Sequence, residues 1–207
     1  MVLPSHRVGP LGFLAHDALL AEERAVNLGL LDQARALAWI ARSIAAFGGD
    51  PSRVTLFGNS AGALSSALHV YLPQSAGLFT RAALMSAAPW RLNTIDEARA
   101  VGSRFAQRAG CVQGDARAVA ACLRALSAAN VSAAASAVVN PFYFVGDVRS
   151  NFAPAVDGVT VKDQPLALFN SHIPTNPVSE LIVGSNHDEG DLLFGVSARL
   201  ISLLGEC

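Results

Sequence analysis

One serine of the sequence stands in a pattern that suits a nucleophile. Ser60 lies at the centre of residues 58–62 (Gly-Asn-Ser-Ala-Gly), between the apolar run 54–57 and a segment rich in alanine and leucine. A strand, a sharp turn and a helix in that order hold a serine hydroxyl clear of the backbone. Glycines two residues to either side allow the strand and the helix to approach without a Cβ clash. The pattern predicts a nucleophilic serine, and the alternative is an ordinary glycine-rich turn.

The residue after the serine has a second predicted role. Ala61 begins the segment that is expected to be a helix. Its backbone N–H can therefore face the oxyanion that develops when Ser60 attacks a carbonyl carbon. Ala61 is the predicted oxyanion donor of this chain.

Hydrophobic patterning predicts the elements that must position the serine. Apolar residues recur at helical spacing from Leu31 to Ile44, and Gly48 and Gly49 follow them. Strands that alternate with helices indicate a mostly parallel α/β sheet. The helical block 94–137 is then an insertion beside that sheet, and residues 15–28 are expected to form a polar surface loop. The predicted strands are 54–57, 82–86 and 180–184, and the later predicted helices are 61–71, 95–108, 116–126 and 163–169.

Several blocks in register resemble one family. Residues 29–33 (Gly-Leu-Leu-Asp-Gln), 46–51 (Ala-Phe-Gly-Gly-Asp-Pro) and 54–58 (Val-Thr-Leu-Phe-Gly) are similar to the type-B carboxylesterases, the α/β-hydrolases that include the cholinesterases. Residues 9–14 and 154–158 resemble the same family, in its order and at its spacing. The resemblance covers nearly the whole chain. It implies an α/β-hydrolase-type, mostly parallel sheet flanked by helices. It also implies a serine-dependent carboxylesterase that acts on a small-molecule carboxylic ester through an acyl-enzyme, with no cofactor.

The resemblance also assigns an acid. Residues 184–190 (Gly-Ser-Asn-His-Asp-Glu-Gly) follow the apolar run 181–183 and are similar to the family's Asp-Glu-Gly loop. In that loop the glutamate orients the catalytic histidine, which implies this role for Glu189. The chain order, serine before acid, is that of the α/β-hydrolases. The alternative is a solvated loop carboxylate beside Asp188.

The general base does not follow from the resemblance. The family places its histidine well beyond the acid, but no histidine follows Glu189, and the family's Gly-Gly oxyanion loop would precede residues 2–13. We therefore expect residues 1–207 to be one partial domain, a central fragment truncated at both ends, and weak or inactive as an esterase. Two alternatives stay open: a non-catalytic binding domain like the neuroligin-type adhesion proteins, and a lipase or other α/β-hydrolase outside this family. None of the five histidines is assigned as the general base: His6, His16, His69, His172 and His187.

The cysteines carry an implication about the compartment. Cys111 and Cys122 lie at positions that resemble a disulfide loop of the family. Closing so short a loop would stabilise the fold by roughly 3 kcal/mol. A disulfide implies an oxidising compartment and hence a secreted or extracellular-facing protein. The alternative is a pair of buried thiols in a cytosolic protein.

Two further positions bear on the substrate. Trp90 lies where the family has an acyl-pocket tryptophan, so it is a candidate pocket wall, and the alternative is a plain core aromatic. Asn59 stands where the family usually has a glutamate before the nucleophile. An amide keeps a hydrogen bond there but not a negative charge, which argues against a preference for cationic esters.

Composition excludes several other functions. The formal net charge is −1 and charged residues make up 15% of the chain, so nothing indicates a nucleic-acid partner or an anionic membrane surface. The longest uncharged stretch, 125–146, contains asparagines, serines and a proline, which argues against a membrane span. No cluster of histidine, cysteine and carboxylate residues has metal-ligand spacing, so no metal is expected. The oligomeric state does not follow from the sequence.

Overall fold

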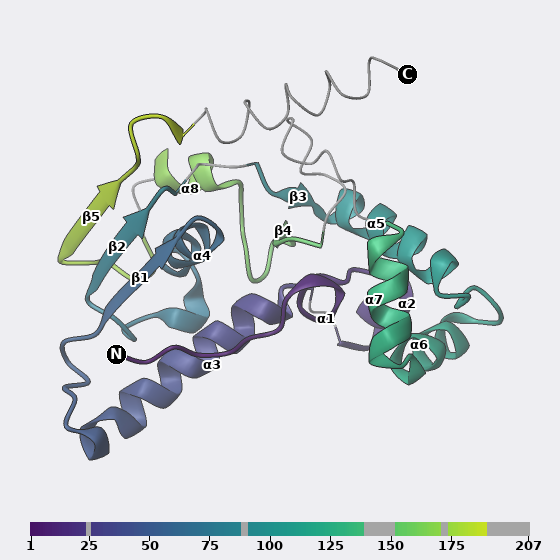
Figure 1. Cartoon of the computed structure of the whole chain (residues 1–207), viewed down its shortest axis with the longest axis horizontal. Coiled ribbons are helices and arrows are strands. Elements are labelled where there is room, and N and C mark those ends of the chain that lie inside the picture. The colour runs from purple at the N-terminus through teal and green to yellow at the C-terminus, as the bar shows by residue number, and fades with distance from the viewer. Residues whose placement is uncertain (24–25, 88–90, 139–151, 171–173, 190–207) are drawn as a thin grey trace.

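The computed structural model describes residues 1–23, 26–87, 91–138, 152–170 and 174–189 (Figure 1). Within these ranges the strands of two parallel sheets alternate with helices along the chain, as the sequence predicts. The helices are α1 (Gly9–Phe13), α2 (Asp17–Glu23), α3 (Leu28–Ser43), α4 (Ala61–His69), α5 (Ile95–Arg108), α6 (Ala116–Ala125), α7 (Ala128–Ser136) and α8 (Pro165–Asn170), with 3-10 turns η1 (Ile44–Phe47) and η2 (Pro73–Ser75). The strands are β1 (Thr55–Asn59), β2 (Arg81–Met85), β3 (Asn93–Thr94), β4 (Ala155–Val156) and β5 (Glu180–Gly184).

The larger sheet has three parallel strands in the order β1-β2-β5. Its register places Asn59 beside Met85 and Met85 beside Gly184, so all three strands end at the same edge. Helix α4 makes the crossover from β1 to β2. The fold is therefore the α/β-hydrolase-type parallel arrangement that the sequence and the resemblance predict.

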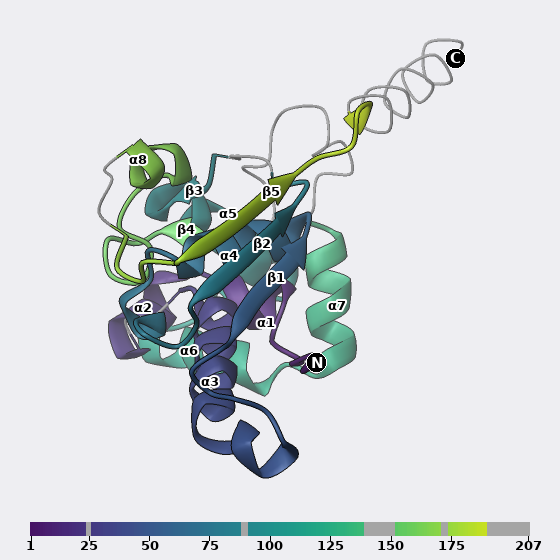
Figure 2. The ribbon, with the colours of Figure 1, turned by 90° about the vertical axis from the view of Figure 1, so that its left-hand side faces the viewer.

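Helix α4 covers only one face of this sheet. Ala82 and Leu84 of β2 are buried on the α4 side, where Leu84 packs with Ala63 and Ala67. Figure 2 shows the opposite face, on which no described helix lies. Apolar side chains remain accessible there, with Phe57 46% and Ile182 71% exposed. Parallel sheets are ordinarily covered on both faces, so this face lacks a covering layer among the described residues.

A separate helical lobe, consisting of α2, α5, α6 and α7, lies beside the sheet (Figure 1). Phe105 of α5 is 1% exposed and meets Phe152 edge to face at a centroid distance of 5.6 Å. A disulfide joins Cys111, which follows α5, to Cys122 of α6, with 5.6 Å between their Cα atoms. The predicted disulfide and the predicted helical insertion are both confirmed.

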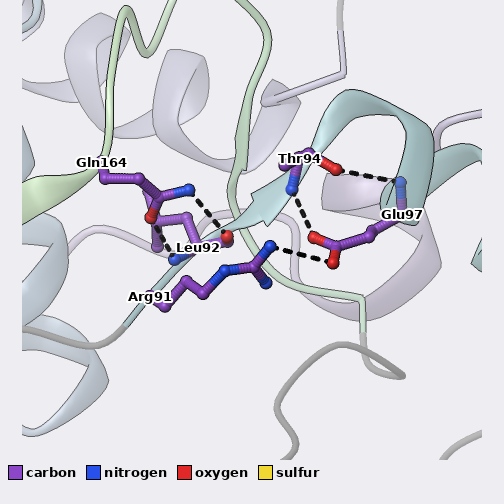
Figure 3. A network of polar contacts seen from close by, with 5 residues as sticks. All are labelled: Arg91, Leu92, Thr94, Glu97 and Gln164. Carbon is purple, nitrogen blue, oxygen red and sulfur yellow. Dashed lines mark hydrogen bonds and ion pairs between the residues drawn. The ribbon is translucent and has the colours of Figure 1, made fainter.

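Polar contacts fix the start of α5 (Figure 3). The Thr94 hydroxyl accepts a hydrogen bond from the Glu97 N–H, and the Glu97 carboxylate accepts one from the Thr94 N–H, which is a capping box. Arg91 donates to the same carboxylate at 2.9 Å. The Gln164 side chain accepts a hydrogen bond from the Leu92 N–H and donates one to the Leu92 carbonyl. Both bonds fix the residue that precedes β3, the strand that leads into α5.

One predicted segment is wrong. Residues 15–28 do not form a polar loop throughout, because α2 occupies Asp17–Glu23. Ala18 of α2 is buried in the core of the helical lobe. A helix this short is marginal in isolation and depends on such packing.

Within the described residues no single helix is long and apolar enough to cross a membrane. Helices α6 and α7 together have the length and apolar composition of a membrane span, but they are bent by 107° with respect to each other.

Candidate active site

Ser60 occupies a strained turn between a strand and a helix. It directly follows β1 and precedes α4, with φ 54° and ψ −118°. Positive φ is uncommon for a residue with a Cβ atom, and such conformations cost of order 1–3 kcal/mol. The Ser60 N–H donates to the Met85 carbonyl at 2.9 Å, so the strand ladder holds this turn in place. Ser60 is exposed, and its geometry is the predicted one.

The glycine before the serine is required by packing. A Cβ atom on Gly58 would lie 2.3 Å from the backbone carbonyl carbon of Gly62. The start of α4 therefore rests directly on β1, as predicted. A Cβ atom on Gly62 would meet no described atom within 4 Å, so the close approach demands glycine at position 58 only.

The structure also defines the positions of the two residues that flank Ser60, Asn59 and Ala61. Ala61 is the first residue of α4, and its N–H is one of the donors that a helix cannot satisfy from its own carbonyls. The Asn59 side chain donates to the Met85 carbonyl at 3.3 Å and adds no charge beside the serine.

Glu189 lies at the same edge of the sheet as Ser60. It follows β5, and β5 ends in register with β2, which itself ends in register with β1. The carboxylate accepts hydrogen bonds from the Ser86 hydroxyl and, at 2.9 Å, from the Asn186 N–H. The Ser86 hydroxyl, and then the Asn186 N–H, hold the pKa of Glu189 below its ordinary value. A carboxylate held ionised here suits an acid that orients an imidazolium.

His69 is the most deeply buried histidine of the described part, at 1% exposure. Its Nδ1 lies 2.6 Å from the Ser75 hydroxyl and its Nε2 lies 2.9 Å from the Gln33 side-chain oxygen. Burial, with a smaller effect of the charge on His6, lowers the pKa of His69 to about 4. Both ring nitrogens are therefore hydrogen-bonded. His69 is the last residue of α4, so it lies at the opposite end of that helix from Ser60.

The other histidines have local contacts of their own. His16 Nδ1 accepts a hydrogen bond from the Ala18 N–H, and His187 Nδ1 lies 2.7 Å from Asp188 on an exposed loop. His172 lies outside the described residues, as does Trp90, the predicted pocket wall. Among the described residues no histidine is hydrogen-bonded to Ser60 or Glu189.

A pocket of about 330 Å³ lies along β1. It is lined by the N-terminal residues Val2–Pro4, by β1 and by side chains of α3 and α4, among them Gln33 and His69. Ser60 and Glu189 are not among its lining residues. It borders the outer edge of β1, which pairs with no described strand.

The fold and the serine turn define an α/β-hydrolase-type domain, and comparison with known proteins gives the family. The family model described as "Carboxylesterase family" matches residues 1–200, and the chain belongs to this family, of the type-B, cholinesterase-like kind. The alternative of a lipase or other α/β-hydrolase outside this family, which the sequence left open, is therefore wrong.

Three relatives illustrate the relationship. The acetylcholinesterase of Electrophorus electricus is 36% identical over 200 residues, which cover 94% of this chain and 30% of that protein. The cholinesterase of Mus musculus is 38% identical over 195 residues, which cover 92% of this chain and 31% of that protein. A solved structure named PNB esterase matches with a TM-score of 0.76 at 34% identity, over 91% of this chain and 38% of that chain. The chain thus spans about a third of the length of the relatives it matches.

Ser86 is the site residue that sequence reasoning missed. It follows β2 without any motif around it, yet its hydroxyl contacts Glu189 over a sequence separation of 103 residues. The only signal available was its position as the last residue of the predicted strand 82–86.

Proposed function

We propose that this chain carries the nucleophile and the acid of a carboxylic ester hydrolase. The observation that supports this most strongly is the turn at Ser60, whose positive φ and exposure present a hydroxyl at the sheet edge to which Glu189 also belongs. Membership of the carboxylesterase family supports the same reaction class.

In the proposed reaction the Ser60 hydroxyl oxygen attacks the ester carbonyl carbon as a base removes its proton. The Ala61 N–H contributes to stabilising the oxyanion of the tetrahedral intermediate. Collapse of that intermediate expels the alcohol, which takes up the proton from the base, and leaves an acyl group on Ser60. Water then attacks the acyl-enzyme, releases the acid and restores the serine.

The base in this scheme is a histidine that Glu189 orients through a carboxylate oxygen. No described histidine is hydrogen-bonded to Ser60 or Glu189; His69 is bonded to Ser75 and Gln33, and His187 lies against Asp188. We propose that the base belongs to a part of the protein beyond these 207 residues. The matched segment makes up 30% and 31% of the two relatives and 38% of the solved structure, so most of each of these chains lies outside it.

The first test is the 207-residue chain alone. After its folding has been verified, a short-chain aryl ester is assayed beside the Ser60→Ala variant. We expect little or no turnover above that variant, because loss of a triad member leaves only about 10³–10⁴-fold catalysis over water even where the oxyanion hole is intact. Robust turnover that disappears in Ser60→Ala would show instead that a histidine of this chain is the base.

The second test places the chain in a complete relative. Residues 1–200 replace the matching segment of the PNB esterase, which is 34% identical. We expect the chimera to hydrolyse esters and Ser60→Ala to lower kcat by about 10⁶, with Glu189→Gln lowering it less, by about 10⁴. A folded chimera that is equally active with and without the Ser60 hydroxyl would contradict the proposal.

The alternative function is a non-catalytic binding domain of neuroligin type. The absence of a histidine bonded to Ser60 or Glu189 among the described residues is the observation that favours it. A folded chimera without any Ser60-dependent turnover is the result that this alternative predicts.

The disulfide supports a proposal about the compartment. A bond between Cys111 and Cys122 is stable in an oxidising environment. We therefore propose that the protein is secreted or faces the cell exterior. In protein isolated from its natural source, two fewer thiols should titrate under denaturing conditions without a reductant than with one.

A further inference from the structure

One tripeptide of the sequence has the form that accepts an N-linked glycan, Asn130-Val131-Ser132. No other asparagine of the chain is followed two residues later by serine or threonine. The middle residue is valine and not proline, which the motif excludes. Short motifs of this kind also arise by chance, so the structural context of Asn130 has to support a modification.

Asn130 lies in the first turn of α7, and it is exposed. Ser127 caps this helix, and its hydroxyl accepts a hydrogen bond from the backbone N–H of Asn130 at 3.2 Å. The side-chain amide of Asn130 makes no hydrogen bond to any described residue. A glycan on Nδ2 would therefore extend into solvent and leave the helix cap intact, as a bulky surface modification requires.

The exposed side of α7 has no charge of its own. None of the nine residues of this helix is charged. Apart from Asn130, its exposed residues are small: Ala128, Ala129, Ser132, Ala133 and Ser136. The rest of the helical lobe does carry exposed ion pairs, such as Arg124 of α6 with Glu22 of α2 at 2.6 Å. Because charged side chains normally keep a protein surface hydrated, α7 is the part of the lobe where a large hydrophilic group would add most.

The lobe also contains a bond that forms in the same compartment as N-linked glycans. The disulfide between Cys111 and Cys122 ends on α6, the helix directly before α7. Disulfides persist in secreted and extracellular-facing proteins, and the glycan acceptor motif has meaning in the same proteins. The disulfide and the tripeptide are independent features of the chain, and both indicate this environment.

The helix itself sets the order of events. Residues two apart on a helix do not face each other, so α7 separates the Asn130 amide from the Ser132 hydroxyl. The two groups can be recognised together only before α7 forms. A helix this short is marginal until it packs, so the segment is accessible to a transferase while the new chain is still unfolded.

We propose that Asn130 is an N-glycosylation site, modified before α7 forms, whose glycan covers the uncharged side of the helical lobe. This inference rests on the proposed compartment. In the transfer, Nδ2 of Asn130 forms a bond to the anomeric carbon of an oligosaccharide and gives up one proton. The bond between that carbon and the diphosphate of a lipid carrier breaks, and the lipid diphosphate leaves. Figure 1 shows α7 at the end of the molecule opposite the three-stranded sheet, so the glycan lies away from the strands that lead to Ser60 and Glu189.

The first test is mass spectrometry of the tryptic peptide 125–149 of protein isolated from its natural source. Treatment with a peptide-N-glycosidase in H₂¹⁸O should convert Asn130 to an aspartate that contains ¹⁸O. Asn140 of the same peptide precedes Pro141 and lies outside the motif, so it should stay asparagine. A sample without the glycosidase should contain no ¹⁸O-labelled aspartate. An Asn130 that carries no glycan in the natural protein would overturn the inference.

Variants test which residues are required. The chain is produced behind a secretion signal in eukaryotic cells, and whole-cell samples are compared by electrophoresis before and after removal of N-glycans. The parent chain and Ser132→Thr should migrate faster after this treatment, whereas Asn130→Gln and Ser132→Ala should not change. Ser136→Ala, the matched exposed serine of the same helix, should behave like the parent. A shift that persists in Asn130→Gln, or that is lost in Ser136→Ala, would contradict the site. The modification precedes folding, so a variant that folds poorly remains informative.

The thiol titration separates this inference from the proposal on which it rests. A natural protein with the disulfide but without a glycan on Asn130 would overturn the site and leave the proposed compartment intact. A natural protein with neither would overturn both. None of these measurements requires turnover, so the esterase reaction is tested separately by the chimera.

Discussion

The helical lobe and the three-stranded sheet differ in how completely their apolar side chains are buried. The lobe has a closed core around Phe105, a disulfide across it, and side-chain caps at the starts of α5, α6 and α7. The sheet is covered on one face by α4, exposes Phe57 and Ile182 on the other, and has two unpaired outer edges among the described residues. The residues proposed for chemistry, Ser60, Ala61 and Glu189, all lie just beyond the carboxyl ends of strands of this sheet. We therefore expect the stability of the chain to depend mainly on the helical lobe, and the proposed chemistry on the edge of the sheet.

The largest contrast is expected from one phenylalanine in each region. Phe105→Ala should lower the free energy of unfolding by about 3–5 kcal/mol, because it leaves a cavity in a closed core. Phe57→Ala should change it by less than about 1 kcal/mol, because nearly half of the side chain is already exposed. Urea unfolding of both variants measures the difference. Equal losses would mean that the open face of the sheet is covered in solution.

The disulfide should contribute the next largest effect. Replacing Cys111 and Cys122 together by alanine should destabilise the chain by about 3 kcal/mol in the chain-entropy account of a short loop. Because the bond lies in the helical lobe, amide exchange should accelerate in α5 and α6 and stay unchanged in β1 and β2. Faster exchange spread evenly over the sheet would show that the two regions unfold as one unit.

His69 provides a pH-dependent test on the underside of the sheet. Its pKa is lowered to about 4 by burial, whereas an unfolded chain titrates near 6.5. Between these values the unfolded state binds more protons, so stability is complete above about pH 6.5 and is lost as the pH falls toward 4. We expect a loss of about 3 kcal/mol from this group across that interval.

Unfolding free energies measured from pH 7.5 to pH 4 check this expectation. His69→Gln should remove that part of the slope. His187→Gln, at a side chain that is 95% exposed, should keep the slope of the parent chain. Parallel profiles for the parent and His69→Gln would show that His69 titrates alike in the folded and unfolded states.

The parts of the fold that could be predicted are those with a local signal. The strand Glu180–Gly184 is an apolar run between turn residues, and the turn at Ser60 is encoded in part by Gly58, which lies against the backbone of Gly62. Helix α2 could not be predicted, because its packing partner α6 lies about 100 residues further along the chain. The contact between Ser86 and Glu189 could not be predicted either, since it depends on the register of β2 against β5 and on the conformation of the loop after β5.

The smallest effect concerns the capping box that begins α5. Thr94→Ala removes the hydroxyl that accepts the Glu97 N–H, and loss of such a cap costs about 1 kcal/mol. Thr94→Ser should restore most of this loss, because it retains the acceptor. Glu97 also binds Arg91 and the Thr94 N–H, so the remaining half of the box stays in place in both variants. Urea unfolding should therefore rank the three proteins as parent, Thr94→Ser and Thr94→Ala, with Glu189 titrating identically in all of them. A change in that titration would mean that the start of α5 is coupled to the edge of the sheet, and the separation of a stable lobe from a functional sheet would no longer hold.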